Sequence, residues 1–207
     1  MASPSVLARA LAPLAVIAGA SAATAANPAL APVEAHLRAA SSMTASFVQT
    51  DSRNRSLSGT LILKRPGKVR FEYGRGTNML LVGNGKTLNF VDYDVGQKST
   101  WPIARSPLAV LLANQPDLSR IATLVASPDP RVMVVQARDP RRPEFGTLLL
   151  AFVRSPAAPG GLMLEGWTAF DAQNRRTTVR LANQRYNVAV ADSAFQFRDP
   201  TARGPRG

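Results

Sequence analysis

The 207-residue sequence contains no cysteine and a single histidine, and its acidic side chains are few. Without cysteine the chain has no disulfide, no thiolate nucleophile and no zinc–thiolate or iron–sulfur site. One histidine and scattered carboxylates are poor material for a metal site, and no G-x-S-x-G motif places a serine for nucleophilic attack. The sequence therefore predicts no enzyme, no catalytic residue, no metal and no cofactor.

Negative charge is also scarce, because 25 Lys and Arg outnumber 13 Asp and Glu and leave a formal net charge of +12. Such an excess attracts anionic membrane surfaces and acidic protein patches in a salt-dependent manner. The arginines are scattered, and no zinc-finger, helix-turn-helix or RNA-recognition pattern accompanies them. We therefore expect no nucleic-acid partner.

The N-terminus carries the apolar run of residues 11–20, which follows the lone basic Arg9 and precedes small residues up to Ala26. This order predicts a secretory signal peptide over residues 1–26, with cleavage near Ala25 or Ala26. A membrane anchor would need about 20 apolar residues, and this run is too short. We expect residues 27–207 to form one soluble, exported domain.

Residues 43–93 carry the strongest structural pattern in the chain. Apolar-rich segments flank the turn-forming pairs Pro66-Gly67 and Asn84-Gly85, the second of which strongly favours a hairpin. Apolar and polar residues alternate in the segment that follows Gly67, as in a strand with one wet face. The pattern predicts a curved antiparallel meander with strands at residues 60–64, 68–73, 78–82 and 86–91.

Helices are expected at two places, after Asn27-Pro28 and at residues 108–113 after Ser106-Pro107. The first helix has an apolar stripe and is either packed on a sheet or a movable lid; His36 is predicted at its surface or edge. Residues 117–126 fit a helix or a strand, and we predict a helix. Further strands are expected at residues 47–49, 97–102, 131–137, 146–153, 162–170, 177–183 and 195–197, followed by a mobile tail from Arg198.

About ten or eleven short strands with two or three helices indicate a barrel or a strongly bent sheet, whose open side the helices cover. The many apolar segments fit two interpretations. A carrier with an empty apolar cavity would need them, and so would a well-filled core, which is the commoner case on composition alone.

Six short motifs occur in an order that resembles the LolA family, the periplasmic carriers of outer-membrane lipoproteins. They follow the signal peptide and first helix and cover nearly all of the remaining chain. The motifs are F-x-Q at residues 47–49, G-x-L-x-L-x-R-P at 59–66, an aromatic strand at 70–73, L-V-x-N-G-K-x-L at 81–88 with its extension to Asp92, S-P-L-x-x-L-L at 106–112 and F-x-F-x-D-P at 195–200.

This resemblance implies a mainly β fold, an unclosed antiparallel β-barrel of about 11 strands with a helical lid over an apolar cavity. It implies a monomeric periplasmic protein that takes lipoproteins from an inner-membrane ATP-driven (ABC) complex and delivers them to an outer-membrane receptor. The alternative is a lipid- or lipoprotein-binding module of the same fold that does not shuttle cargo. The residues expected to line the cavity are Phe47, Leu61, Leu63, Val69, Phe71, Leu80, Leu88, Leu108, Leu111, Leu112, Leu149 and Trp167.

The resemblance also implies a role for Arg65, the arginine of the R-P turn. In the family this arginine hydrogen-bonds the lid helices in the closed state, so Arg65 is expected to act as a lid latch; the alternative is a solvated turn arginine. The chain departs from the family pattern at Val69, where phenylalanine is usual, and at Phe71, where tryptophan is usual. These departures leave open a different lipid cargo.

Overall fold

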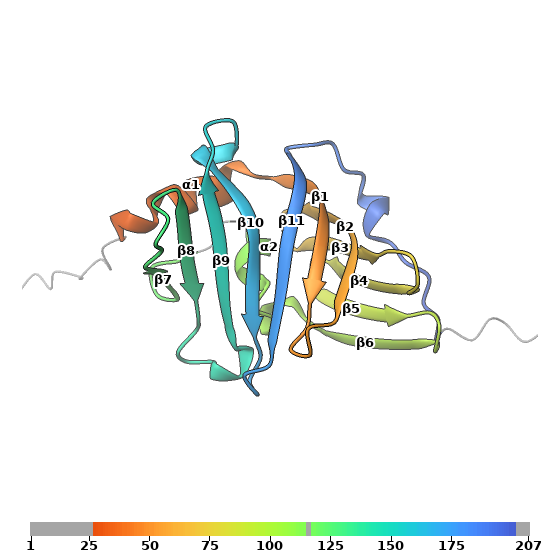
Figure 1. The fold of residues 1–207 in the computed structure, drawn as a ribbon. Coiled ribbons are helices and arrows are strands. Elements are labelled where there is room, and N and C mark those ends of the chain that lie inside the picture. The colour runs from red at the N-terminus through yellow and green to blue at the C-terminus, as the bar shows by residue number, and fades with distance from the viewer. Residues whose placement is uncertain (1–26, 115–116, 202–207) are drawn as a thin grey trace, which may run out of the picture.

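The computed structural model describes residues 27–114 and 117–201 (Figure 1), so the predicted signal peptide lies outside the described residues. Within them, one antiparallel sheet has the strand order β6-β5-β4-β3-β2-β1-β11-β10-β9-β8-β7, and β6 and β7 are its two edges. The strands are β1 (Ser42–Thr50), β2 (Ser56–Lys64), β3 (Lys68–Tyr73), β4 (Met79–Asn84), β5 (Thr87–Asp92), β6 (Gln97–Pro102), β7 (Ala122–Val125), β8 (Val132–Ala137), β9 (Thr147–Arg154), β10 (Leu162–Phe170) and β11 (Arg176–Tyr186). The predicted unclosed antiparallel barrel is confirmed.

Two α-helices accompany the sheet in the described residues. The first, α1 (Ala31–Ala39), follows the 3₁₀ turn η1 (Pro28–Leu30), in which Asn27 Oδ1 accepts a hydrogen bond from the Ala29 N–H at 3.1 Å. The second, α2 (Ala109–Leu112), belongs to the connection from β6 to β7 and lies behind the front strands in Figure 1. Neither helix, nor any other in the part of the chain that is described, is long and apolar enough to cross a membrane.

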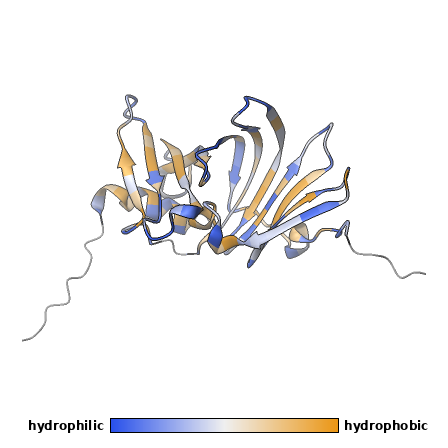
Figure 2. Ribbon diagram, turned by 90° about the horizontal axis from the view of Figure 1, so that it is seen from below, coloured by the Kyte–Doolittle hydropathy of each residue, from blue (hydrophilic) through white to orange (hydrophobic). Residues whose placement is uncertain are grey.

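The main core lies between the concave face of the sheet and these helices. Alternate residues of each strand supply it, as the inward Leu148, Leu150 and Phe152 of β9 illustrate. Seen from below, apolar strand segments face each other across the fold (Figure 2). An edge-to-face series of aromatic rings, Trp167–Phe71–Phe47–Tyr73, crosses the core with centroid separations of 6.0, 5.2 and 5.3 Å.

The chain after β11, residues 187–201, forms what we call the C-terminal strap, which covers the outer face of β2–β6. Its Phe195 packs on Leu80 and Val82 in a second buried cluster. Asp192 accepts 2.7 Å contacts from both Lys64 and Lys68, and these two ammonium groups lower its carboxyl pKa to about 2. The predicted strand at residues 195–197 is wrong, because this segment is the 3₁₀ turn η5 (Asp192–Phe195) and the extended residues after it.

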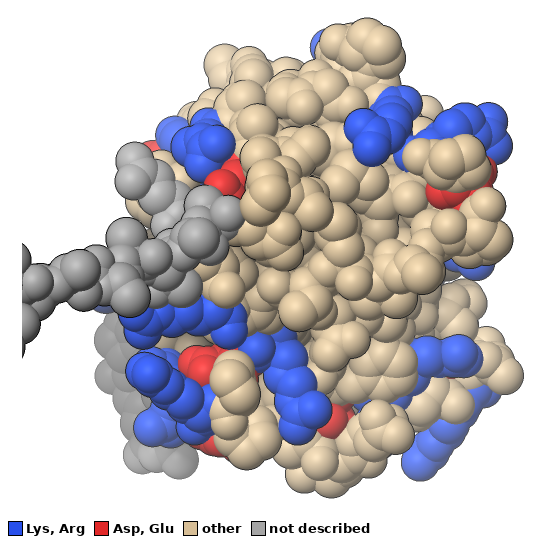
Figure 3. Space-filling view, turned by 90° about the vertical axis from the view of Figure 1, so that its left-hand side faces the viewer, with Lys and Arg blue, Asp and Glu red and all other residues tan. Residues whose placement is uncertain are grey.

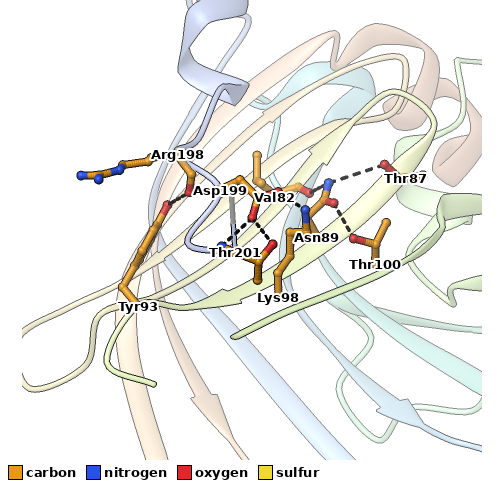
Figure 4. A network of polar contacts seen from close by, with 9 residues as sticks. All are labelled: Val82, Thr87, Asn89, Tyr93, Lys98, Thr100, Arg198, Asp199 and Thr201. Atoms are coloured by element: carbon orange, nitrogen blue, oxygen red, sulfur yellow. Dashed lines mark hydrogen bonds and ion pairs between the residues drawn. The ribbon is translucent and has the colours of Figure 1, made fainter. Parts of the chain in front are cut away.

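The end of the strap is held by polar contacts with β6 and with the turn between β5 and β6 (Figure 4). The Tyr93 hydroxyl donates to the Arg198 carbonyl at 2.9 Å, and Lys98 forms an ion pair with Asp199. Beneath them the buried Asn89 accepts from the Thr100 hydroxyl at 2.9 Å. Residues 198–201 are therefore fixed to the sheet, whereas the sequence predicts a mobile tail from Arg198.

The predicted helix at residues 117–126 is also corrected, since its second half is the edge strand β7. The Arg138 N–H donates to the Ile121 carbonyl at 2.7 Å, and Ala122 is in register with Ala137 of β8. Apolar residues spaced three apart suit a helix, but pairing with β8, the next strand in the chain, decides the conformation.

We predict that Gly59→Ala lowers the free energy of unfolding by about 1–3 kcal/mol. A methyl group at Gly59 would meet the Glu72 carbonyl oxygen at 2.0 Å and the Phe47 ring at 2.8 Å, so β2 and β3 would have to separate. Gly74→Ala is the control, because its nearest neighbour lies at 3.3 Å, and its effect should stay within about 0.5 kcal/mol. Denaturant unfolding measures both, and equal losses would contradict the prediction.

Candidate functional site

An apolar chamber lies between the concave face of the sheet and the two helices. Its own side chains nearly fill it, and they leave a void of about 10 Å³ beneath the helices. The void is lined by His36, Ala40, Met43, Leu63, Arg65, Leu111, Leu164 and Tyr186. Larger apolar ligands can occupy this chamber only if the helices move.

Arg65, in the turn between β2 and β3, connects the sheet to both helices. Its Nε donates to the Leu111 carbonyl at 2.8 Å, and its Nη1 donates to the carbonyls of Leu37, at 2.7 Å, and of Ala40. These acceptors lie at the C-terminal ends of α2 and α1, where carbonyls have no intrahelical donor and the helix dipole favours a cation. Beside them the Gly67 N–H donates to the Leu112 carbonyl at 2.8 Å.

The Arg65 side chain carries its charge out of water. Burial lowers the pKa of Arg65 to about 10, so the guanidinium stays protonated at neutral pH. Hydrogen bonds to a charged donor contribute about 1.5–3 kcal/mol each. The Arg65 contacts therefore contribute to holding both helices on the β2–β3 turn.

His36 is not at the surface as predicted; it is 1% exposed and faces the chamber. Its ring stands edge-on to Phe152 and Tyr186, with both centroid distances 5.4 Å. The His36 Nδ1 lies 2.8 Å from the Pro159 carbonyl, which can only accept, so Nδ1 carries the proton. Burial lowers the pKa of His36, and the nearby Arg65 charge lowers it further. The ring thus joins α1 to the β9–β10 turn.

A second, open space lies on the concave face where β1 turns into β2. This mouth pocket has a volume of about 430 Å³ and is lined by Gln49, Asp51, Arg55, Leu57, Tyr73, Met79 and Phe90. Its apolar side chains pack against the main core, so the pocket continues the chamber. The Tyr73 hydroxyl donates to Gln49 Oε1 at 3.0 Å, and burial raises the pKa of Tyr73 to about 12.

The residues predicted to line a cavity fall into two groups. Those brought together in or against the main core are Phe47, Leu61, Leu63, Val69, Phe71, Leu88, Leu108, Leu111, Leu112 and Trp167. Leu80 lies instead under the C-terminal strap, and Leu149 lines a depression on the outer face of β8–β11.

The strand pairing explains why Leu80 and Leu149 lie outside the chamber. Leu61 is opposite Phe71, and Phe71 is opposite Leu81, so Leu81 and not Leu80 shares the inner face. In β9 the same alternation places Leu148 and Leu150, and not Leu149, on the inner face. Sequence reasoning also missed Leu57, Met79 and Phe90 of the mouth pocket, which the same alternation could have identified.

This fold and site define an unclosed barrel with a helical lid over an apolar chamber. Residues 38–198 match the family model described as outer membrane lipoprotein carrier protein LolA. Because the match spans well over half of the sequence, the chain belongs to the LolA family, as the motif order predicts. Among the described residues, no three His, Cys, Asp or Glu side chains gather as a metal site.

Several known proteins are similar to the chain. An outer-membrane lipoprotein carrier protein of Chromobacterium violaceum is 28% identical over 194 residues, covering 90% of this chain and 91% of that protein. One of Methylobacillus flagellatus is 28% identical over 178 residues, covering 81% and 83%. The crystal structure of a LolA superfamily protein from Nitrosomonas europaea has a TM-score of 0.45 and 10% identity, covering 83% of this chain and 99% of that one.

We predict that the protein loses stability as the pH falls from about 7.5 to about 5.5. Folding depresses the pKa of His36 below 6.5, so the unfolded chain binds more protons in this range and unfolding becomes easier. Because His36 is the single histidine, His36→Gln, which keeps an N–H donor, should flatten this slope. Denaturant titrations at both pH values measure the effect; an unchanged slope in the variant would exclude His36 as its source.

Proposed function

We propose that this chain is a periplasmic carrier that shields lipoprotein acyl chains in the apolar chamber and carries them from the inner to the outer membrane. The observation that carries the proposal is the set of Arg65 hydrogen bonds, which join both helices to the sheet over an apolar interior. Membership of a lipoprotein carrier family and the predicted signal peptide over residues 1–26 support it. Residues 27–207 would be the mature carrier domain, with no catalytic role.

The energetics require such a carrier. At about 0.8 kcal/mol per methylene, an acyl chain of about fifteen methylenes exposed to water costs roughly 12 kcal/mol, which prevents free diffusion between membranes. A chamber of aliphatic and aromatic side chains can shield an acyl chain from water without recognising its detailed structure. The mouth pocket is open already, whereas the void beneath the helices holds nothing until they move.

Release requires two states of similar free energy. In the proposed cycle the Arg65 contacts favour the closed, empty state, and cargo favours the open state. An acceptor can then remove the cargo because closing the lid recovers the Arg65 hydrogen bonds. The partners would be lipoproteins, the inner-membrane ABC complex that releases them and the outer-membrane receptor.

We predict that Arg65→Leu still accepts cargo but fails to pass it on. The variant leaves the closed state without its charged donors, so the cargo-bound state becomes more favourable, by about 10-fold or more for a single charged hydrogen bond. Purified protein loaded with lipoprotein and mixed with the receptor measures transfer.

Arg75→Leu, at an exposed arginine of the β3–β4 turn, is the matched control and should transfer normally. Arg65→Lys keeps the charge but lacks the planar fork that reaches both helices, so it should transfer at an intermediate rate. Handover by Arg65→Leu at the wild-type rate would remove Arg65 from the mechanism.

Depletion of the protein in cells separates a carrier from a module that binds without shuttling. For a carrier, outer-membrane lipoproteins should accumulate in the inner membrane, and native mass spectrometry should find lipid or lipoprotein on the periplasmic protein. Normal lipoprotein sorting after depletion, with purified protein that holds cargo but never releases it, would favour the non-shuttling module.

A further inference from the structure

The two edges of the sheet are not equally protected. Strand β6 carries Lys98, which forms an ion pair with the C-terminal strap, and it ends at Pro102; charge and proline are both devices that block strand addition. Strand β7 has neither within its four residues, and in the described sheet it pairs with β8 alone. Its residues Thr123–Val125 are exposed. Among the described residues η1 also lies near β7, but no strand pairs with its outer edge, so this edge is available for another extended chain.

The pairing with β8 identifies which backbone groups of β7 are free. The Arg138 N–H donates to the Ile121 carbonyl at 2.7 Å, which places this pair at a hydrogen-bonded position of the ladder. Hydrogen-bonded positions alternate along an antiparallel pair, so Thr123 and Val125 bond to β8. Leu124 then turns its N–H and C=O outward, and it is 39% exposed.

The β7 edge adjoins the proposed cargo site. Ala122 of β7 belongs to the main core, and Leu124 is opposite the buried Val135 on the inner face. The chain that leads into β7 carries α2, whose Leu111 carbonyl Arg65 binds. Figure 3 looks onto the β7 side of the molecule, where a surface without charged residues has Lys and Arg, and fewer Asp and Glu, at its margins. An extended segment without matching charges can lie there.

We propose that the β7 edge binds the main chain of the cargo polypeptide next to its acylated residue, as an added strand. This inference rests on the proposed function, because it concerns the peptide next to an acylated residue whose acyl chains lie in the chamber. Recognition through main-chain groups suits a carrier of many lipoproteins, because strand addition takes its affinity from the backbone and little from side chains.

Leu124→Pro tests the proposal, because it deletes the outward N–H and leaves the ladder to β8 intact; proline is tolerated on an edge strand in this orientation. The probes are a triacylated lipopeptide with a short peptide extension and the same triacylated cysteine without it. We expect Leu124→Pro to bind the lipopeptide about threefold to tenfold more weakly and the short probe as wild type does. Leu124→Ala, which keeps the N–H, is the control and should bind both probes alike.

Circular dichroism and thermal unfolding check that the variant folds. A second measurement avoids the variant altogether and compares two lipopeptides, one N-methylated at the odd residues of its peptide extension and one at the even residues. Wild-type protein should bind one of the two more weakly than the other, because only one set of N–H groups faces β7 in an added strand. Equal affinity for all N-methylated and unmethylated lipopeptides would overturn the inference and leave the carrier function standing. A wild-type dimer that Leu124→Pro dissociates would also overturn it, by giving the edge to a second copy. Failure of wild type to bind either triacylated probe would instead count against the proposed function.

Discussion

A guanidinium removed from water needs acceptors in place of the water it loses, and this requirement determines the arrangement of the closed protein. Few groups in a folded chain have spare acceptor capacity, and the last carbonyls of a helix are among them. Arg65 uses such carbonyls on two helices that are distant in sequence, Leu37 and Ala40 on one side and Leu111 on the other. The turn between β2 and β3 thereby sets where both helices lie on the sheet.

The sheet has two apolar faces, and different segments of the chain cover them. On the outer face, the C-terminal strap covers β2–β6 through Phe195 and through ion pairs at Lys64, Lys68 and Lys98. On the inner face, two short helices form the cover; Arg65 bonds both of them to the β2–β3 turn, and His36 bonds α1 to the Pro159 turn. Under the proposed function it is the inner cover that moves, so the Arg65 and His36 hydrogen bonds would break when it opens.

Local sequence patterns predicted the antiparallel meander because neighbouring residues determine its turns and strands. Asn84-Gly85 specifies a hairpin, and alternation from Val69 to Tyr73 specifies a strand with one buried face. The family resemblance implied that Arg65 bonds to the helices, and these hydrogen bonds are present, whereas its role as a lid latch stays a prediction. The predictions that failed depended on contacts with residues outside the segment itself. β7 becomes a strand through β8, and His36 is buried through the Pro159 turn. Leu80 and Leu149 were assigned to the inner face without a register to fix the phase.

The Arg65 contacts have a consequence for how such proteins diverge. Every acceptor of Arg65 is a peptide carbonyl, so the closing interaction does not depend on which side chains the helices carry. Substitutions on the lid can therefore alter the size and shape of the oily compartment while the means of closing it persists. Under the proposed function, a change of side chain in the chamber, as at Val69, would alter what the chamber holds and leave these backbone acceptors in place.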